Sequence, residues 1–186
     1  MRDCLKSDIA DEIRWFKEET AWIKADTPWE SVVPIDEQEL KNQVLDVISS
    51  TRPADLRSRL EIETQGKHIG FVCSYPLDYN FEPIQYGKAE GNAKKYCALG
   101  IEICEPAFWG KGLGRQVLAA TIRYYQDNGF NDFYLETWSG NTRMLKCAQK
   151  LGFYICKQIP AFRQASGIDY DAVILLLDGN KFKEYY

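Results

Sequence analysis

Residues 108–115 read FWGKGLGR, with glycine at positions 110, 112 and 114. Glycine loses more conformational freedom on folding than any other residue, so it is kept where the backbone needs a positive φ or where another group must approach closely. A predicted strand precedes this stretch and a predicted helix follows it. Backbone N–H groups at a helix N-terminus carry partial positive charge and bind phosphates, and Lys111 and Arg115 add formal charge. The stretch is therefore either a tight turn or a phosphate-binding loop.

The spacing of the glycines excludes two common phosphate motifs. A P-loop requires GxxxxGK followed by Ser or Thr, and the dinucleotide fingerprint is GxGxxG, whereas these glycines read GxGxG. On spacing alone, a turn without a ligand and a phosphate site are equally consistent with the stretch.

The elements around this stretch follow from hydrophobic periodicity, because helices and strands space their apolar residues differently. The predicted elements are a helix that starts near Asp8 and continues to Thr27, a helix from 36 to 48, strands over 60–64 and 69–75 joined by a turn at 65–67, a loop over 76–95, a strand over 99–104, a helix from the glycines to 128, a strand over 132–138, a helix over 141–151, and strands over 153–159 and 171–177. This order predicts one domain, residues 1–186, of the α+β class, with a mixed, mainly antiparallel central sheet and helices on both faces.

Length and composition indicate a soluble globular protein. Of the 186 residues, 45% are hydrophobic and 27% are charged, which is ordinary for a single folded domain. The net charge of −4 offers no clustered Lys and Arg for nucleic acid or an anionic membrane surface, so neither is expected as a partner. The start MRDCLKSD lacks the apolar segment of a signal peptide, and no apolar run is long enough to span a membrane, so we expect a cytoplasmic protein.

The cysteines and the single histidine do not form a metal motif. The six cysteines are scattered and contain no CxxC pair, so we expect reduced thiols and no bound metal. His68 follows the turn signal Gly66-Lys67, which predicts a solvated turn residue.

A second motif, NTRMLKCAQKLGF at residues 141–153, lies downstream of the glycines. Together the two motifs resemble the GNAT superfamily of acyl-CoA-dependent N-acetyltransferases, in which [QR]xxGx[GA] binds the pyrophosphate of acetyl-CoA and an NxxxxxxxxKxGF helix flanks the pantetheine arm. Trp109 stands where many members have Gln or Arg. The WGKG form and the opening MRDCLKSD are similar to the ribosomal-protein-alanine (RimJ/RimL-type) branch. The resemblance implies a GNAT-type fold over nearly the whole chain and acetyl-CoA as cosubstrate.

The resemblance also implies which residues hold the cofactor. Backbone amides of residues 110–115 would bind the pyrophosphate, and Asn141 would bond the pantetheine, although an N-cap role for Asn141 is the simpler interpretation. The residues carried over in this way are Gly110, Lys111, Gly112, Leu113, Gly114, Arg115 and Asn141, with backbone N–H groups near Ile103 and Cys104 stabilising the oxyanion that forms during transfer.

Acetyl transfer to an amine requires a base, because an alkylamine with a pKa near ~10 is mostly protonated at neutral pH. Glu102 is the candidate on the strand where this family places the thioester, with Glu105 and Glu136 as rivals. Many relatives have a tyrosine as general acid where this chain has Ala148. Another tyrosine could supply the proton, or the thiolate could leave unassisted. Cys147, the residue before Ala148, is expected to be a core residue and not a nucleophile, so we do not expect a ping-pong mechanism.

The acceptor is expected to be a primary amine, either of a small molecule or of a peptide N-terminus. Acidic side chains and tryptophans in the N-terminal helices suit a cation, although a buried aromatic face with a solvated acidic one explains the same pattern. The runs SYPLDYN and EPAFWGKGLG also look like aminoglycoside 6′-N-acetyltransferases, so an aminoglycoside or polyamine acceptor stays open. Ala148 leaves open a non-catalytic acyl-CoA sensor, and the tail KFKEYY leaves open a homodimer.

Overall fold

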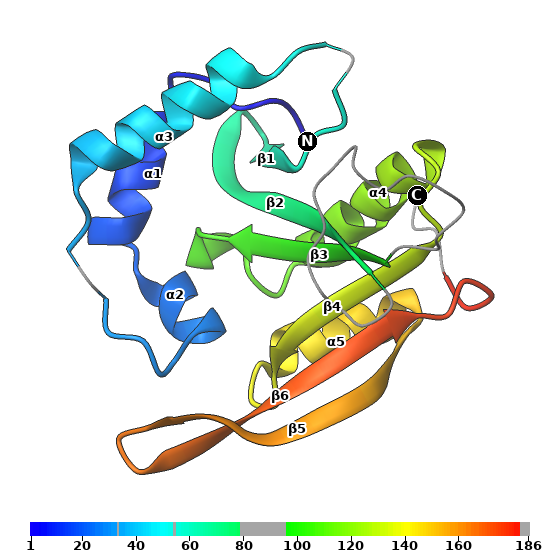
Figure 1. The fold of residues 1–186 in the computed structure, drawn as a ribbon. Helices are drawn as coiled ribbons and strands as arrows, with labels where there is room; N and C mark the ends of the chain where they lie inside the picture. The colour runs from blue at the N-terminus through cyan, green and yellow to red at the C-terminus, as the bar shows by residue number, and fades with distance from the viewer. Residues whose placement is uncertain (33, 54, 79–95, 183–186) are drawn as a thin grey trace. The chain divides into compact units, whose positions relative to one another are not determined.

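The computed structural model describes residues 1–32, 34–53, 55–78 and 96–182. Most of the predicted loop over 76–95 and most of the KFKEYY tail lie outside these residues. The elements, drawn in Figure 1, are α1 (Asp8–Lys17), α2 (Ala21–Asp26), α3 (Glu37–Ser50), β1 (Arg59–Thr64), β2 (Lys67–Leu77), β3 (Tyr96–Ile103), the short 3₁₀ helix η1 (Pro106–Phe108), α4 (Leu113–Asp127), β4 (Asp132–Trp138), α5 (Thr142–Leu151), β5 (Phe153–Ala165) and β6 (Ile168–Leu177).

The strands form a six-stranded sheet in the order β1-β2-β3-β4-β6-β5. β3 and β4 run parallel, in a register that joins Tyr96 to Asp132 and Ala98 to Tyr134. β4 with β6 and β5 with β6 are antiparallel. This arrangement confirms the predicted α+β class with a mixed, mainly antiparallel sheet.

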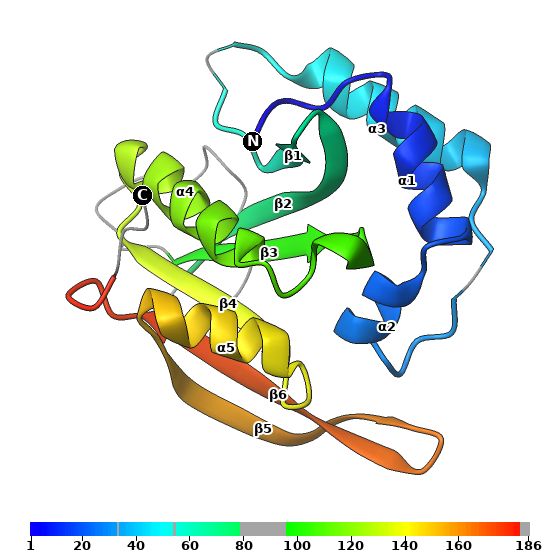
Figure 2. The ribbon, with the colours of Figure 1, turned by 180° about the vertical axis from the view of Figure 1, so that it is seen from behind.

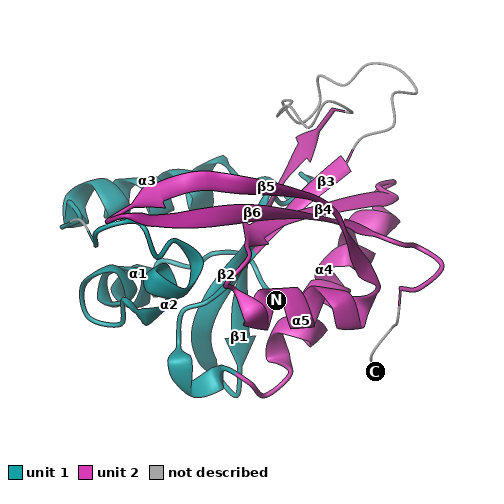
Figure 3. Ribbon diagram, turned by 90° about the horizontal axis from the view of Figure 1, so that it is seen from below, with its two compact units in different colours: residues 1–72, 101–109 teal, residues 73–100, 110–186 magenta. Residues whose placement is uncertain are grey.

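The chain divides into two compact units, coloured separately in Figure 3. Unit 1 comprises Met1–Val72 and Ile101–Trp109, and unit 2 comprises Cys73–Gly100 and Gly110–Tyr186. The single domain expected from the sequence stays a prediction. No helix among the described residues has the length and apolar character needed to cross a membrane.

In unit 2, α4 and α5 lie on one face of β4 and β6, as Figure 2 shows from behind. The apolar face of α4 is buried through Leu118, Ile122 and Tyr125, and α5 buries Ala148 and Leu151. The α5 ends match the sequence signals. Asn141 accepts a hydrogen bond from the Met144 N–H at 3.2 Å, and the left-handed Gly152 closes the helix.

The predicted first helix is in fact two helices. α1 ends at Lys17 and α2 begins at Ala21. The break lets the Trp22 indole donate to the Trp15 carbonyl at 3.1 Å and pack edge-on against Phe16 and Phe71. The packing of this partly buried aromatic side chain is worth more than the helical turn that is lost, since the intrinsic helix preference is only a few tenths of a kcal/mol per residue.

The last two strands are longer than the apolar runs predicted, and they continue as a hairpin past residue 159. Pro160 cannot donate to a sheet, and a register shift between Ile159 and Arg163 accommodates it. Ala161 takes a φ of 50° there, and its N–H donates to an Asp171 carboxylate oxygen at 3.0 Å. The bulge lets the strand continue beyond a residue that the sequence pattern treats as a stop.

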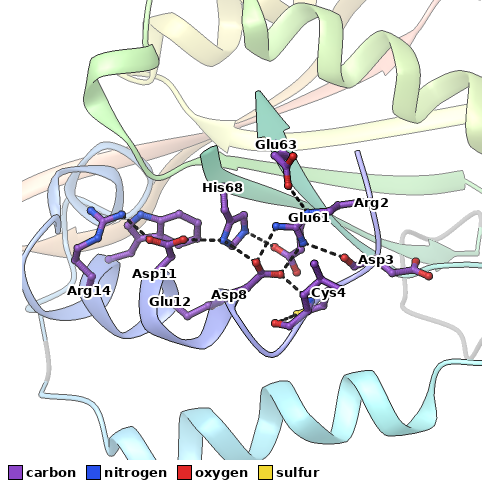
Figure 4. A network of polar contacts seen from close by, with 12 residues as sticks. Arg2, Asp3, Cys4, Asp8, Asp11, Glu12, Arg14, Glu61, Glu63 and His68 are labelled. Carbon is purple, nitrogen blue, oxygen red and sulfur yellow. Dashed lines mark hydrogen bonds and ion pairs between the residues drawn. The ribbon is translucent and has the colours of Figure 1, made fainter. Parts of the chain in front are cut away.

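Two polar side chains of the β1–β2 hairpin are buried, contrary to expectation. Glu61, a charged residue within the predicted strand 60–64, is 0% exposed although charged residues are rarely buried, and His68, expected to be solvated, is 8% exposed. The His68 ring lies among carboxylates (Figure 4), with Nε2 at 3.0 Å from Glu61 and Nδ1 at 3.5 Å from Asp8 and 3.4 Å from Asp11. Burial alone would lower the pKa of His68. The hydrogen bond with Glu61 and the charges of Asp8 and Glu61 raise this pKa by more than burial lowers it, so the pKa of His68 is raised overall.

Arg59 holds the deeper part of the same cluster together. Its guanidinium pairs with Glu12, which is 1% exposed, and with Glu61 at 2.8 Å. The guanidinium also lies 4.1 Å from the centroid of the Phe71 ring. Burial raises the pKa of Glu12 despite Arg59, whereas at Glu61 hydrogen bonds from His68 and Arg59 overcome burial and lower the pKa. The cluster is a buried ion network in which each carboxylate depends on a neighbouring cation.

Candidate active site

The glycine stretch forms an open turn that leads into α4. Gly110 has φ 73°, and Gly112, the N-cap, has φ 81°, so both adopt the left-handed conformation that favours glycine. A Cβ at either position would meet no atom of the described residues within 4 Å. The glycines are therefore required by the backbone conformation and not by crowding within the protein, and they leave open space above the turn.

The start of α4 is suited to an anion. No side chain caps this end of the 15-residue helix, and the N–H groups of a first helical turn have no partner within the helix. The exposed Lys111 and the partly buried Arg115 add positive charge beside them. Open backbone, N–H groups without partners within the helix and two basic residues together fit a pyrophosphate group.

Asn141, also in unit 2, has the N-cap role that its sequence position suggested. Ala148, seven residues further along on α5, is 0% exposed. Its side chain has no hydroxyl that could serve as a general acid. Burial raises the pKa of the Cys147 thiol to about 11, which keeps it protonated at neutral pH and makes it a poor nucleophile.

The strand end that carries Glu102 belongs to unit 1. Glu102 is partly buried on β3, and burial, reinforced by the charge of Asp26, raises its pKa well above the usual value. No hydrogen bond or ion pair joins its carboxyl to any residue that the structure describes. An unpaired, desolvated carboxyl with a raised pKa is what a general base near neutral pH requires.

The backbone after Glu102 is held in place by two contacts. The Cys104 N–H donates to the Ile69 carbonyl at 2.8 Å, so this N–H is engaged in the sheet and does not bind an oxyanion. Successive N–H groups of a strand point to opposite edges, so that of Ile103 points away from β2. The Trp109 indole donates to the Ile103 carbonyl at 2.6 Å, a contact that the motif did not predict and that fixes the chain just before the glycines.

The two rival carboxylates have partners of their own. Glu105 accepts from the Trp15 indole at 2.8 Å and pairs with Arg14. Burial alone would raise the pKa of Glu105, but these hydrogen bonds lower it, so Glu105 is a structural anion and a weak base. Glu136, in unit 2, is exposed and accepts from the Tyr134 hydroxyl at 2.5 Å. Burial and this bond raise the pKa of Tyr134, which therefore stays a neutral phenol.

Known structures show the same fold at low sequence identity. A ribosomal-protein-alanine N-acetyltransferase from Brucella melitensis is 15% identical, with TM-score 0.67, 94% of this chain and 96% of that chain covered. A spermidine N-acetyltransferase from Vibrio cholerae, in complex with CoA and spermine, is 16% identical, with TM-score 0.69 and coverages of 97% and 95%. The yncA protein of Salmonella typhimurium, with its cofactor acetyl-CoA, is 19% identical, with TM-score 0.66 and coverages of 100% and 94%.

No match was found among curated protein sequences. The family model described as the acetyltransferase (GNAT) family matches residues 14–153, which is more than half of the chain and includes Glu102, the glycine turn and α5. The chain therefore belongs to the acetyltransferase (GNAT) family, whose members are N-acetyltransferases that use acetyl-CoA as cosubstrate.

Proposed function

We propose that this acetyltransferase transfers the acetyl group of acetyl-CoA directly to the primary amine of a cationic acceptor, with Glu102 as the base. The single observation that carries the proposal is the Glu102 carboxyl, which is desolvated, unpaired among the described residues and raised in pKa. Acetyl-CoA supplies the acetyl group as a thioester. Glu102 takes the proton that the acceptor's nitrogen loses, and the thiol leaves with a proton from solvent or a neutral tyrosine.

The cofactor would be held by the N-terminal end of α4. Backbone N–H groups of residues 110–115 would bind the pyrophosphate, with Lys111 and Arg115 adding charge and the Ile103 N–H facing the thioester oxygen. Asn141 would contact the pantetheine with its amide while its Oδ1 caps α5. The N–H of Cys104, which the sequence suggested for the oxyanion, donates instead to the Ile69 carbonyl and so would hold the end of β3 in place beside the thioester.

The acceptor class is where the candidates diverge. The motifs WGKG and MRDCLKSD support the RimJ/RimL-type branch and hence a protein N-terminus, while the fold is shared with a spermidine acetyltransferase. Aminoglycosides remain a third candidate. All three acceptors carry a primary amine on a cationic molecule, which is the chemistry that an uncompensated carboxyl recognises.

Saturating acetyl-CoA is expected to stabilise the protein against thermal unfolding. At 100-fold over Kd the gain is about 2.7 kcal/mol, which corresponds to a few degrees for a chain of this size. Thiol release should then be measured against a panel of N-terminal peptides, polyamines and aminoglycosides. The absence of a thermal shift would contradict cofactor binding. A shift without thiol release from any amine would instead support an acyl-CoA sensor.

Gly110→Ala is expected to weaken acetyl-CoA binding at least roughly tenfold. A Cβ there would enter the space that the pyrophosphate needs, and the left-handed φ costs about 1–2 kcal/mol of stability. Gly66→Ala is the matched control, since Gly66 has φ 72° against 73° at Gly110, and a Cβ at either site meets no described atom within 4 Å. Both variants should lose similar stability in urea unfolding, and calorimetric titration with acetyl-CoA should separate them. Equal affinities would show that the turn does not contact the cofactor.

A further inference from the structure

The contacts of α2 fix the helix face that carries Asp26 against β2. The Trp22 ring packs edge-on against Phe71 of β2, with centroids 6.2 Å apart, and its indole is bonded to the Trp15 carbonyl. Asp26 is four residues after Trp22, and residues four apart lie on the same face of a helix. The face of α2 that Trp22 fixes against β2 therefore also carries Asp26.

β3, which carries Glu102, lies unusually close to β2 at Gly70, the residue before Phe71. A Cβ on Gly70 would lie 1.9 Å from the Glu102 carbonyl oxygen, so the backbones of β2 and β3 approach as closely as glycine allows. One residue later, Phe71 contacts Trp22. α2 therefore packs through Trp22 on the part of β2 that lies against the Glu102 backbone, and the charge of Asp26 adds to the effect of burial on Glu102.

Neither carboxyl has a cation as partner within the described part of the chain. Among the described residues, no ion pair or hydrogen bond is formed by the side chain of Asp26 or Glu102. The titratable group that acts on Asp26 is the carboxylate of Glu30. Glu102, in turn, adds to the effect of burial in raising the pKa of the Cys104 thiol. At this level β2 contributes Gly70 and Phe71, which do not titrate.

We propose that Asp26 is a positioning residue for the transfer reaction, which acts through Glu102 by keeping a negative charge beside it and thereby makes Glu102 a stronger base toward a cationic amine. The inference rests on the proposed role of Glu102. Burial and the charge of Glu30 raise the pKa of Asp26, and burial and the charge of Asp26 raise the pKa of Glu102 well above its usual value, so Glu102 keeps its proton to a higher pH than an ordinary glutamate does. The ammonium of the acceptor gives one proton to Glu102, and the neutral amine attacks the thioester carbonyl as the nucleophile. The C–N bond forms, the C–S bond breaks, and the second proton of the nitrogen passes to the leaving thiolate or to solvent.

The test is the pH dependence of kcat/KM for Asp26→Asn, measured with a polyamine or peptide amine that the wild type accepts. Loss of the neighbouring charge lowers the pKa of Glu102, so the acid limb, where activity rises with the carboxylate form of Glu102, should move to lower pH. KM for the cationic acceptor should rise roughly tenfold, as expected from the loss of one nearby charge. Asp26→Glu should restore the wild-type limb, and the Kd for acetyl-CoA should stay unchanged.

The exposed Glu30 gives the control, and Glu102 separates the two hypotheses. Glu30→Gln should leave the limb close to its wild-type position, because Glu30 acts on Asp26 and not directly on Glu102. If Asp26→Asn reduces activity equally at all pH values, its role is structural and the proposal is wrong. If Glu102→Gln removes the acid limb while Asp26→Asn leaves it in place, only the Asp26 proposal fails. If Glu102→Gln keeps both turnover and limb, the base assignment fails as well.

Discussion

Glu102→Gln is expected to lower kcat/KM by roughly 10²- to 10⁴-fold, the usual contribution of a general base, while the affinity for acetyl-CoA stays within about a factor of two. The amide has nearly the same shape as the carboxyl but cannot take a proton from the acceptor's nitrogen. Because Glu102 is already desolvated and without a cation, removing its charge breaks no ion pair, and the fold should be retained. Steady-state kinetics with a fixed amine, together with calorimetric titration of acetyl-CoA, measure the two effects separately.

The pH profile adds a readout that a damaged fold does not mimic. Wild-type activity needs Glu102 as carboxylate, so kcat/KM should fall as the pH drops through its raised pKa, at higher pH than an ordinary glutamate would cause. In Glu102→Gln this limb should disappear from the residual activity. Glu136→Gln is the comparison, since the exposed Glu136 is the remaining carboxylate candidate. A large loss of kcat/KM in Glu136→Gln, with normal turnover in Glu102→Gln, would identify Glu136 on β4 as the base instead.

Arg59→Met is expected to destabilise the protein by about 3–5 kcal/mol, the loss typical of removing one partner from a buried ion pair. The substitution leaves Glu12 and Glu61, which are 1% and 0% exposed, with less compensating charge. Native proteins are stable by only about 5–15 kcal/mol, so this is a large fraction of the total. Urea unfolding followed by circular dichroism measures the change.

The direction of the pH effect follows from the two carboxylates. Without Arg59, the folded-state pKa of Glu12, which burial already raises, rises further, and the pKa of Glu61 rises because burial is then opposed only by His68. A carboxyl with a raised folded pKa favours folding below its unfolded pKa and loses that contribution as the pH rises through the folded value. The destabilisation should therefore be largest at neutral pH and shrink toward about pH 5.

Two further variants calibrate this result. Lys17→Met removes an ion pair whose side chains are 51% and 52% exposed, and it should cost far less stability than Arg59→Met, because solvent screens an exposed pair. Adding Glu12→Gln to Arg59→Met should recover part of the lost stability, because one unpaired buried charge is removed. A loss in Arg59→Met as small as that in Lys17→Met would mean that solvent screens the network.

Features that depend on a few consecutive residues were predicted well from the sequence. The left-handed glycines before α4, the Asp36 cap on α3, whose carboxylate accepts from the Gln38 and Glu39 N–H groups, and the Gly152 cap were all visible as motifs. The α+β class followed from the order of the periodic segments. The glycine turn and the Asn141 motif also indicated the family that the comparison later confirmed.

The errors concern residues whose environment comes from distant parts of the chain. His68 follows a turn signal and was expected in solvent, yet Asp8, Asp11 and Glu61 surround it. The predicted first helix breaks because Trp22 gains more by packing on Phe71 than by continuing the helix. Local periodicity contains no information on these contacts, because Asp8 and Asp11 are 60 and 57 residues from His68 and Trp22 is 49 residues from Phe71.

By itself, the sequence determined the turn, the caps, the strand and helix order, and the cofactor class, because each depends on backbone conformation within a few residues. Only the tertiary structure decided which carboxylate is suited to act as the base. Glu102, Glu105 and Glu136 are the same amino acid and cannot be ranked from the sequence. In the fold, Glu102 is desolvated and under the influence of the Asp26 charge, Glu105 is paired with Arg14 and Trp15, and Glu136 is exposed to solvent. A carboxyl's proton affinity is set by its burial and its neighbouring charges, and those exist only once the chain has folded.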